Sequence, residues 1–131
     1  TVFNVCNYIY KNSTNSDTLK NIGGITIVNL MPHYLTDSSL LVKHKGHLID
    51  KKNLGIIDNW CQQISKVIVA WGNHPKGLFD EYEFLKSQVN EILKVRKNEV
   101  FYVKQLSQAG NPRHGQVWGY KDPLLSLKVE S

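Results

Sequence analysis

The segment KVIVAWGNHPKG, residues 66–77, decides how the rest of the chain is interpreted. Its first half, 66–71, is rich in β-branched residues and apolar on both faces, which is typical of a buried strand in a parallel sheet. Its second half, 72–77, contains two glycines and a proline, which predicts a loop. Apolar residues at helical spacing flank the segment and predict helices over 54–65 and 78–93, the first of which buries Cys61.

The same alternation of strands and helices extends outward along the chain. A short helix is expected over 2–11, a buried strand over 25–31 (ITIVNLM) and a further strand over 100–106 (VFYVKQL). Strands that alternate with helices imply right-handed crossovers and a parallel sheet covered on both faces. We therefore predict an α/β fold of three layers, α/β/α, with a short parallel sheet and a single domain over residues 1–131.

Composition excludes several classes of protein. The 131 residues include no apolar stretch of the roughly 18 residues that a membrane helix needs, and no signal peptide, so we expect a cytoplasmic protein without a membrane partner. Sixteen basic residues against eleven acidic ones give a net charge of +5, which favours a polyanionic partner. Fourteen of the cations are lysines, which attract phosphates but do not read base edges, so sequence-specific DNA binding is disfavoured.

Metal ligands and cofactor motifs are weakly represented. His44, His47 and Asp50, with His33, are conceivable metal ligands, but histidines in a lysine-rich stretch are more often solvated. We expect no metal and no cofactor.

Ligands of parallel α/β sheets bind where loops leave the carboxyl ends of the strands. The segments that qualify are 29–34, 72–77 and 110–120. Asn29 ends the first strand and offers a donor and an acceptor to a base edge, or else its amide only caps the adjoining backbone. In the second segment the backbone and side chains can hold a phosphate, or they form an ordinary turn; the residues concerned are Gly72, Asn73, His74 and Lys76.

The third segment, GNPRHGQVWGY at 110–120, carries the largest number of candidate ligand-binding residues. We expect Arg113 and His114 on phosphates, with Trp118 or Tyr120 stacking on a base. The alternative is a structured turn in which Trp118 and Tyr120 close the core. The remaining candidates for contact with a phosphate or a partner are Gly110, Pro112 and Gln116.

Taken together, ITIVNL, VIVAWGNHPKG and QAGNPRHGQVWGY resemble a domain of unknown function from bacteria, phages and mobile gene cassettes that is itself similar to uracil-DNA glycosylases. The resemblance spans nearly the whole chain. It places Asn29 on the position that reads uracil, and Trp71 with Gly72 on the end of the next strand. Asn111 and Pro112 fall on the glycosylase His-Pro pair, so an amide replaces the catalytic imidazole, and His114 lies three residues further on.

The resemblance also implies what this chain lacks. The glycosylase loop that positions water precedes the first helix, and nothing before Thr1 carries it. The resemblance therefore implies a missing first strand, with either a rearranged three-stranded sheet or truncation at the N-terminus. Each such catalytic group is worth roughly 10² to 10³ in rate, so we expect no efficient uracil excision and a pseudoenzyme, with Asn111 and His114 as degenerate catalytic positions.

Three functions remain open at this stage. The first is a pseudoenzyme decoy whose basic face binds an acidic, DNA-mimicking glycosylase inhibitor, or nucleic acid. The second is an active enzyme that processes a nucleobase or nucleotide through Asn29, Asn111 and His114. The third is a DNA-binding module without sequence preference.

Overall fold

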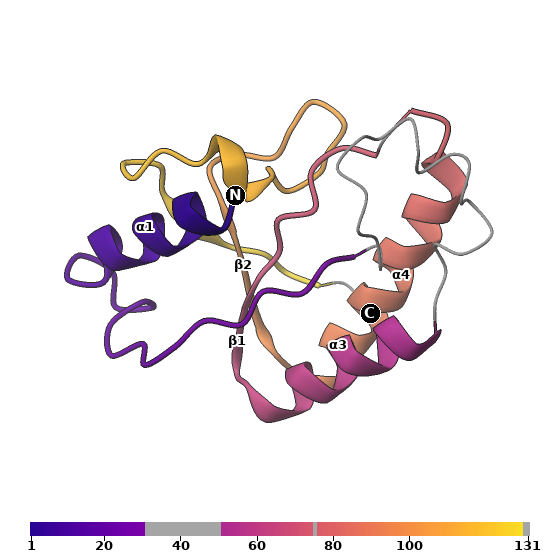
Figure 1. Cartoon of the computed structure of the whole chain (residues 1–131), viewed down its shortest axis with the longest axis horizontal. Helices are drawn as coiled ribbons and strands as arrows, with labels where there is room; N and C mark the ends of the chain where they lie inside the picture. Colours follow the sequence, from indigo (N-terminus) through magenta and orange to yellow (C-terminus); the bar gives the residue numbers. More distant parts are fainter. Residues whose placement is uncertain (31–50, 75, 130–131) are drawn as a thin grey trace. The chain divides into compact units, whose positions relative to one another are not determined.

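The computed structural model of the chain describes residues 1–30, 51–74 and 76–129 (Figure 1). In order along the chain, its helices and strands are α1 (Val2–Asn12), α3 (Lys51–Gln63), β1 (Lys66–Ile68), α4 (Phe79–Arg96), β2 (Glu99–Val103), the 3-10 helix η2 (Gly115–Val117) and β3 (Leu124–Ser126). The predicted helices over 2–11, 54–65 and 78–93 correspond to α1, α3 and α4. No helix in the described ranges has the length and apolar character needed to cross a membrane.

The strands form one sheet in the order β1-β2-β3. β1 pairs in parallel with β2, and the register aligns Lys66 with Glu99 and Ile68 with Phe101. The Lys104 N–H donates to the Pro123 carbonyl, and the Leu127 N–H donates to the Val100 carbonyl. The partner residues follow in opposite order along the two strands, so β3 runs antiparallel to β2. Within the described residues the chain is therefore a small α/β protein with a three-stranded mixed sheet, and the prediction of an all-parallel sheet was wrong.

The error lies in the segment predicted as the strand 25–31. Residues 22–29 have no regular secondary structure, and Ile25, Ile27 and Val28 are exposed; Met31 lies outside the described residues. A β-branched run becomes a strand only when neighbours pair with its backbone and pack on its side chains. The two neighbours of β2 in the sheet are β1 and β3, and residues 25–29 belong to no strand.

The described chain divides into two compact units, and β2 runs through both. Unit 1 consists of Thr1–Val28, Val69–Asn73 and Tyr102–Leu125. Its core contains side chains from α1, the adjoining loop and the strand ends: Tyr8, Ile9, Leu19, Val69, Val103 and Trp118. Unit 1 lies entirely within the described residues, so its side chains can be considered together.

Unit 2 contains α3 and α4, which pack on each other through buried apolar faces. The core residues of α4 recur at the three- and four-residue intervals that the sequence predicted: Tyr82, Leu85, Val89 and Leu93. Cys61 is buried on α3, as predicted, and burial raises the pKa of its thiol. A protonated thiol inside an apolar interface is a poor nucleophile, so Cys61 has a packing role.

Candidate functional site

The loop that follows β2 is held against the end of the segment after β1. The Gly72 backbone N–H donates to the Pro112 carbonyl at 2.9 Å. Gly72 adopts a φ of 72°, and a Cβ atom at this position would lie 3.3 Å from the His114 Cβ. A glycine is required here because L-residues disfavour this backbone region and because the loop approaches so closely.

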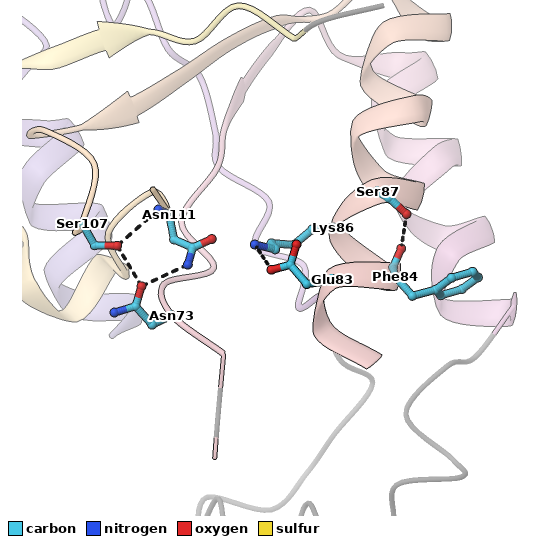
Figure 2. A network of polar contacts seen from close by, with 7 residues as sticks. All are labelled: Asn73, Glu83, Phe84, Lys86, Ser87, Ser107 and Asn111. Atoms are coloured by element: carbon cyan, nitrogen blue, oxygen red, sulfur yellow. Dashed lines mark hydrogen bonds and ion pairs between the residues drawn. The ribbon is translucent and has the colours of Figure 1, made fainter. Parts of the chain in front are cut away.

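Three polar residues, Asn73, Ser107 and Asn111, form an amide cluster beside this backbone contact (Figure 2). The Asn73 Oδ1 accepts from the Ser107 hydroxyl at 2.8 Å and from the Asn111 side-chain amide at 3.0 Å. Ser107 Oγ accepts from the Asn111 backbone N–H at 3.2 Å, and the Ser107 backbone N–H donates to the Asn111 carbonyl at 2.9 Å.

The amide cluster has a structural consequence for Asn111, which is 5% exposed. Its side-chain amide donates to Asn73, so Asn111 holds the loop closed. An amide and a hydroxyl have no pKa near neutrality, so the cluster supplies neither a general acid nor a general base.

His114 lies at the start of η2 and is turned toward the backbone. Its Nδ1 accepts a hydrogen bond from the Gln116 backbone N–H at 3.2 Å. Burial lowers the pKa of the imidazole below 6.5. The ring is therefore neutral at pH 7 with its proton on Nε2, and it supplies no positive charge to a leaving group or a phosphate.

Arg113 and Trp118 are joined through the backbone of the same loop. The Arg113 Nε donates to the Gln105 carbonyl at 2.9 Å, a bond that fixes this half-buried side chain. The Trp118 indole N–H donates to the Arg113 carbonyl at 3.0 Å. Trp118 is 6% exposed, and its ring centroid lies 5.4 Å from that of Tyr8. Trp118 thus closes the core, which is the alternative that the sequence left open for it.

Tyr120 behaves differently from Trp118. Its side chain is 51% exposed, so the alternative in which Tyr120 also closes the core does not hold. Of the two aromatics in the segment, only Tyr120 has a ring available at the surface.

The structure brings together a subset of the predicted site residues. Unit 1 contains Gly72, Asn73, Gly110, Asn111, Pro112, Arg113, His114, Gln116 and Trp118. Unit 2 contains Asn29, His74 and Lys76, and each has its own surroundings there. The Asn29 carbonyl accepts from the Asn53 amide at 3.0 Å, the His74 ring meets the Phe79 ring edge-on at 5.0 Å, and Lys76 is exposed.

The metal ligands considered from the sequence, His33, His44, His47 and Asp50, lie outside the described residues. Within the ranges 1–30, 51–74 and 76–129 no group of three or more histidines, cysteines or carboxylates gathers around one point.

The residues of α1 that hold the loop were missed from the sequence. Asn4 donates its amide to the carbonyls of Gly115 and Trp118, and the Tyr8 hydroxyl donates to the Asp122 carbonyl at 2.7 Å. Asn12 donates to the Tyr120 carbonyl at 2.9 Å. Asn4, Tyr8 and Asn12 recur every four residues, and this polar stripe along one helix face was the signal that could have identified them.

Residues 4–115 match the model of a family described as a protein of unknown function, DUF1643, and the chain belongs to that family. The match includes α1, Asn29, Gly72 and the loop as far as Gly115. No curated protein and no solved structure matches the chain.

Proposed function

We propose that this member of the DUF1643 family is a catalytically inactive protein with a uracil-DNA glycosylase-like, three-layer fold, and that it binds a DNA-like polyanion. The ligand that we place first is an acidic protein that imitates DNA, of the kind that inhibits glycosylases, and the second is nucleic acid itself. The binding surface is the Arg113 loop, residues 105–118, with Gly72 and Asn73 of the segment after β1.

The observation that carries the proposal is the charge of unit 1. Unit 1 has five basic side chains and two acidic ones; the basic ones are Lys11, Lys20, Lys104, Arg113 and Lys121. Of the two carboxylates, Asp122 accepts from the Gly119 backbone N–H at 2.7 Å. An excess of cations over one unit attracts a polyanion from a distance and does not depend on catalytic groups.

The chemistry of the loop supports an inactive protein. Breaking a glycosidic bond requires a group that stabilises the departing base and a group that positions water, each worth roughly 10² to 10³ in rate. The Asn111 amide is bonded to Asn73, and the His114 imidazole is neutral and bonded to Gln116. Neither side chain has a free charge to offer to a leaving base.

Competition between the two ligands tests the proposal. A labelled DNA duplex is titrated with the protein, and an acidic glycosylase inhibitor is then added. We expect the inhibitor to bind the chain and displace the duplex, and we expect Arg113→Ala to weaken binding while Lys94→Ala, an exposed lysine on α4, does not. Failure to bind either polyanion at low salt contradicts the proposal.

A base-release assay tests the enzymatic alternative with the same preparation. Uracil-containing DNA is incubated with excess protein, and free base is measured. We expect no release above the background without protein. Turnover that is abolished by Asn29→Ala would refute the proposal and establish an active nucleobase enzyme.

A further inference from the structure

The exposed ring of Tyr120 lies between two lysines on the surface of unit 1. The Lys11 Nζ is 4.6 Å from the ring centroid, and the Lys121 Nζ is 5.8 Å from it. The hydrogen bond from Asn12 to the Tyr120 carbonyl, at 2.9 Å, ties this turn to the end of α1. The ring and both ammonium groups are therefore held at one place by the fold.

Two further aromatic side chains of α1 are exposed but lie on another face of the helix. Tyr10 is 80% exposed and Phe3 is 82% exposed. Tyr10 is two residues from Asn12, so it points to the side of the helix opposite to the one that contacts the Tyr120 turn. We call Tyr120, Lys11 and Lys121 the aromatic-lysine surface.

The electrostatics of this surface favour an anion. α1 contains no acidic residue, and Lys11 occupies its last turn. An exposed cation–π contact is worth only about 0.5–1 kcal/mol, so either lysine can leave the ring for a phosphate at little cost. That exchange brings a phosphate to the ammonium group and at the same time uncovers a face of the ring.

We propose that the aromatic-lysine surface binds single-stranded nucleic acid, with phosphates on Lys11 and Lys121 and an unpaired base on Tyr120. An exposed aromatic ring with lysines beside it is suited to single strands, because only unpaired bases present a face for stacking. A duplex or an acidic protein satisfies the lysines but leaves the ring without a partner. This proposal goes beyond the function proposed above, since none of its residues belongs to the Arg113 loop.

Fluorescence anisotropy with a labelled oligothymidine of about 20 nucleotides, and with a duplex of the same length, tests the proposal. The full chain is expected to bind the single strand more tightly than the duplex. Tyr120→Ala is expected to weaken single-strand binding about 5- to 150-fold, the range for loss of one stacked base, and Tyr120→Phe is expected to retain it. Lys11→Gln is expected to reduce the salt slope by about 0.7, as for one lost phosphate contact.

Matched controls come from α4 in unit 2. The Phe84 side chain is 44% exposed, and the Ser87 hydroxyl donates to the Phe84 backbone carbonyl at 2.7 Å (Figure 2). Phe84→Ala and Lys94→Ala are therefore expected to leave binding unchanged. Circular dichroism of each variant shows whether it is folded.

Three results would overturn the proposal. The first is tighter binding of the duplex than of the single strand, and the second is a folded Tyr120→Ala variant that binds the single strand as well as the parent does. The third is displacement of the single strand by an acidic protein to the same extent in the parent and in Tyr120→Ala. Arg113→Ala separates the two proposals. If only Arg113→Ala loses binding to the single strand, the Arg113 loop is the binding site and the proposal for the aromatic-lysine surface is rejected. If only Tyr120→Ala loses binding, the aromatic-lysine surface is the binding site and the proposal for the loop is rejected.

Discussion

Gly115→Ala tests whether α1 packs on the loop as the structure describes. Gly115 opens η2, and a Cβ atom built on it would lie 2.5 Å from the Val5 Cγ2, 3.7 Å from the Thr1 Cγ2 and 4.0 Å from the Trp118 Cε2. A distance of 2.5 Å between carbon atoms is far inside van der Waals contact. Either the Val5 side chain turns away or α1 and the loop separate.

The expected cost follows from that clash. Overpacking a well-packed site costs about 1–3 kcal/mol. With an unfolding entropy of about 2.1 cal/mol/K per residue, the 131-residue chain is expected to lose about 4–11 °C in Tm. A separation of α1 from the loop would also weaken the hydrogen bond from the Asn4 amide to the Gly115 carbonyl.

A double-mutant cycle identifies the cause. Thermal and urea unfolding are measured for Gly115→Ala, for Val5→Ala and for the double variant. Because Val5→Ala removes the methyl group that clashes, the double variant is expected to be more stable than the sum of the two single effects predicts, by at least about 0.5 kcal/mol. Additive effects, or a Gly115→Ala variant as stable as the parent, would show that α1 does not pack on η2 in this way.

Three further predictions concern pH and backbone conformation. In an NMR titration His114 is expected to titrate below 6.5, so its contribution to stability is complete above that pH and falls as protons are added below it. The hydrogen bond from Arg96 lowers the pKa of Asp58, so the urea midpoint of the parent is expected to exceed that of Asp58→Asn at pH 6, and the difference is expected to vanish as the pH falls through the folded pKa. Gly72→Ala is expected to cost about 1–2 kcal/mol in urea unfolding because φ at that position is 72°, and a cost near zero would contradict the left-handed conformation.

The helices could be predicted from the sequence because their information is local. Leu85, Val89 and Leu93 recur at four-residue intervals and are buried, and the same periodicity identified α1 and α3. The strands depended on more distant information. The sequence predicted β2 as far as residue 106, but it ends at Val103 because Lys104 adopts a φ of 67°, a conformation that no local pattern indicated.

β3 could not be predicted because it is only three residues long and directly follows a proline. Its three residues become a strand only because the Lys104 N–H donates to the Pro123 carbonyl and the Leu127 N–H to the Val100 carbonyl. The apolar run at 25–31 had the stronger strand signal. Strand formation depends on finding a partner, and composition alone does not reveal which segment finds one.

The side-chain positions in the candidate site could be predicted only in part. The sequence identified the loop at 110–120 but left open whether its aromatics stack on a ligand or close the core; Trp118 is buried in the core, and Tyr120 is exposed. Trp118 has an indole N–H that is satisfied within the loop, which allows full burial. Tyr120 follows Gly119 in a turn closed by Asp122, so its ring is carried to the surface.

The amide cluster fixes the backbone of the Arg113 loop. The Asn111 side-chain amide donates to Asn73, and its backbone N–H donates to Ser107. Those bonds hold the backbone that places Arg113, and a fixed cation loses less entropy when it binds an anion. The same contacts that occupy the Asn111 side-chain amide therefore favour the anion binding that we propose for this loop.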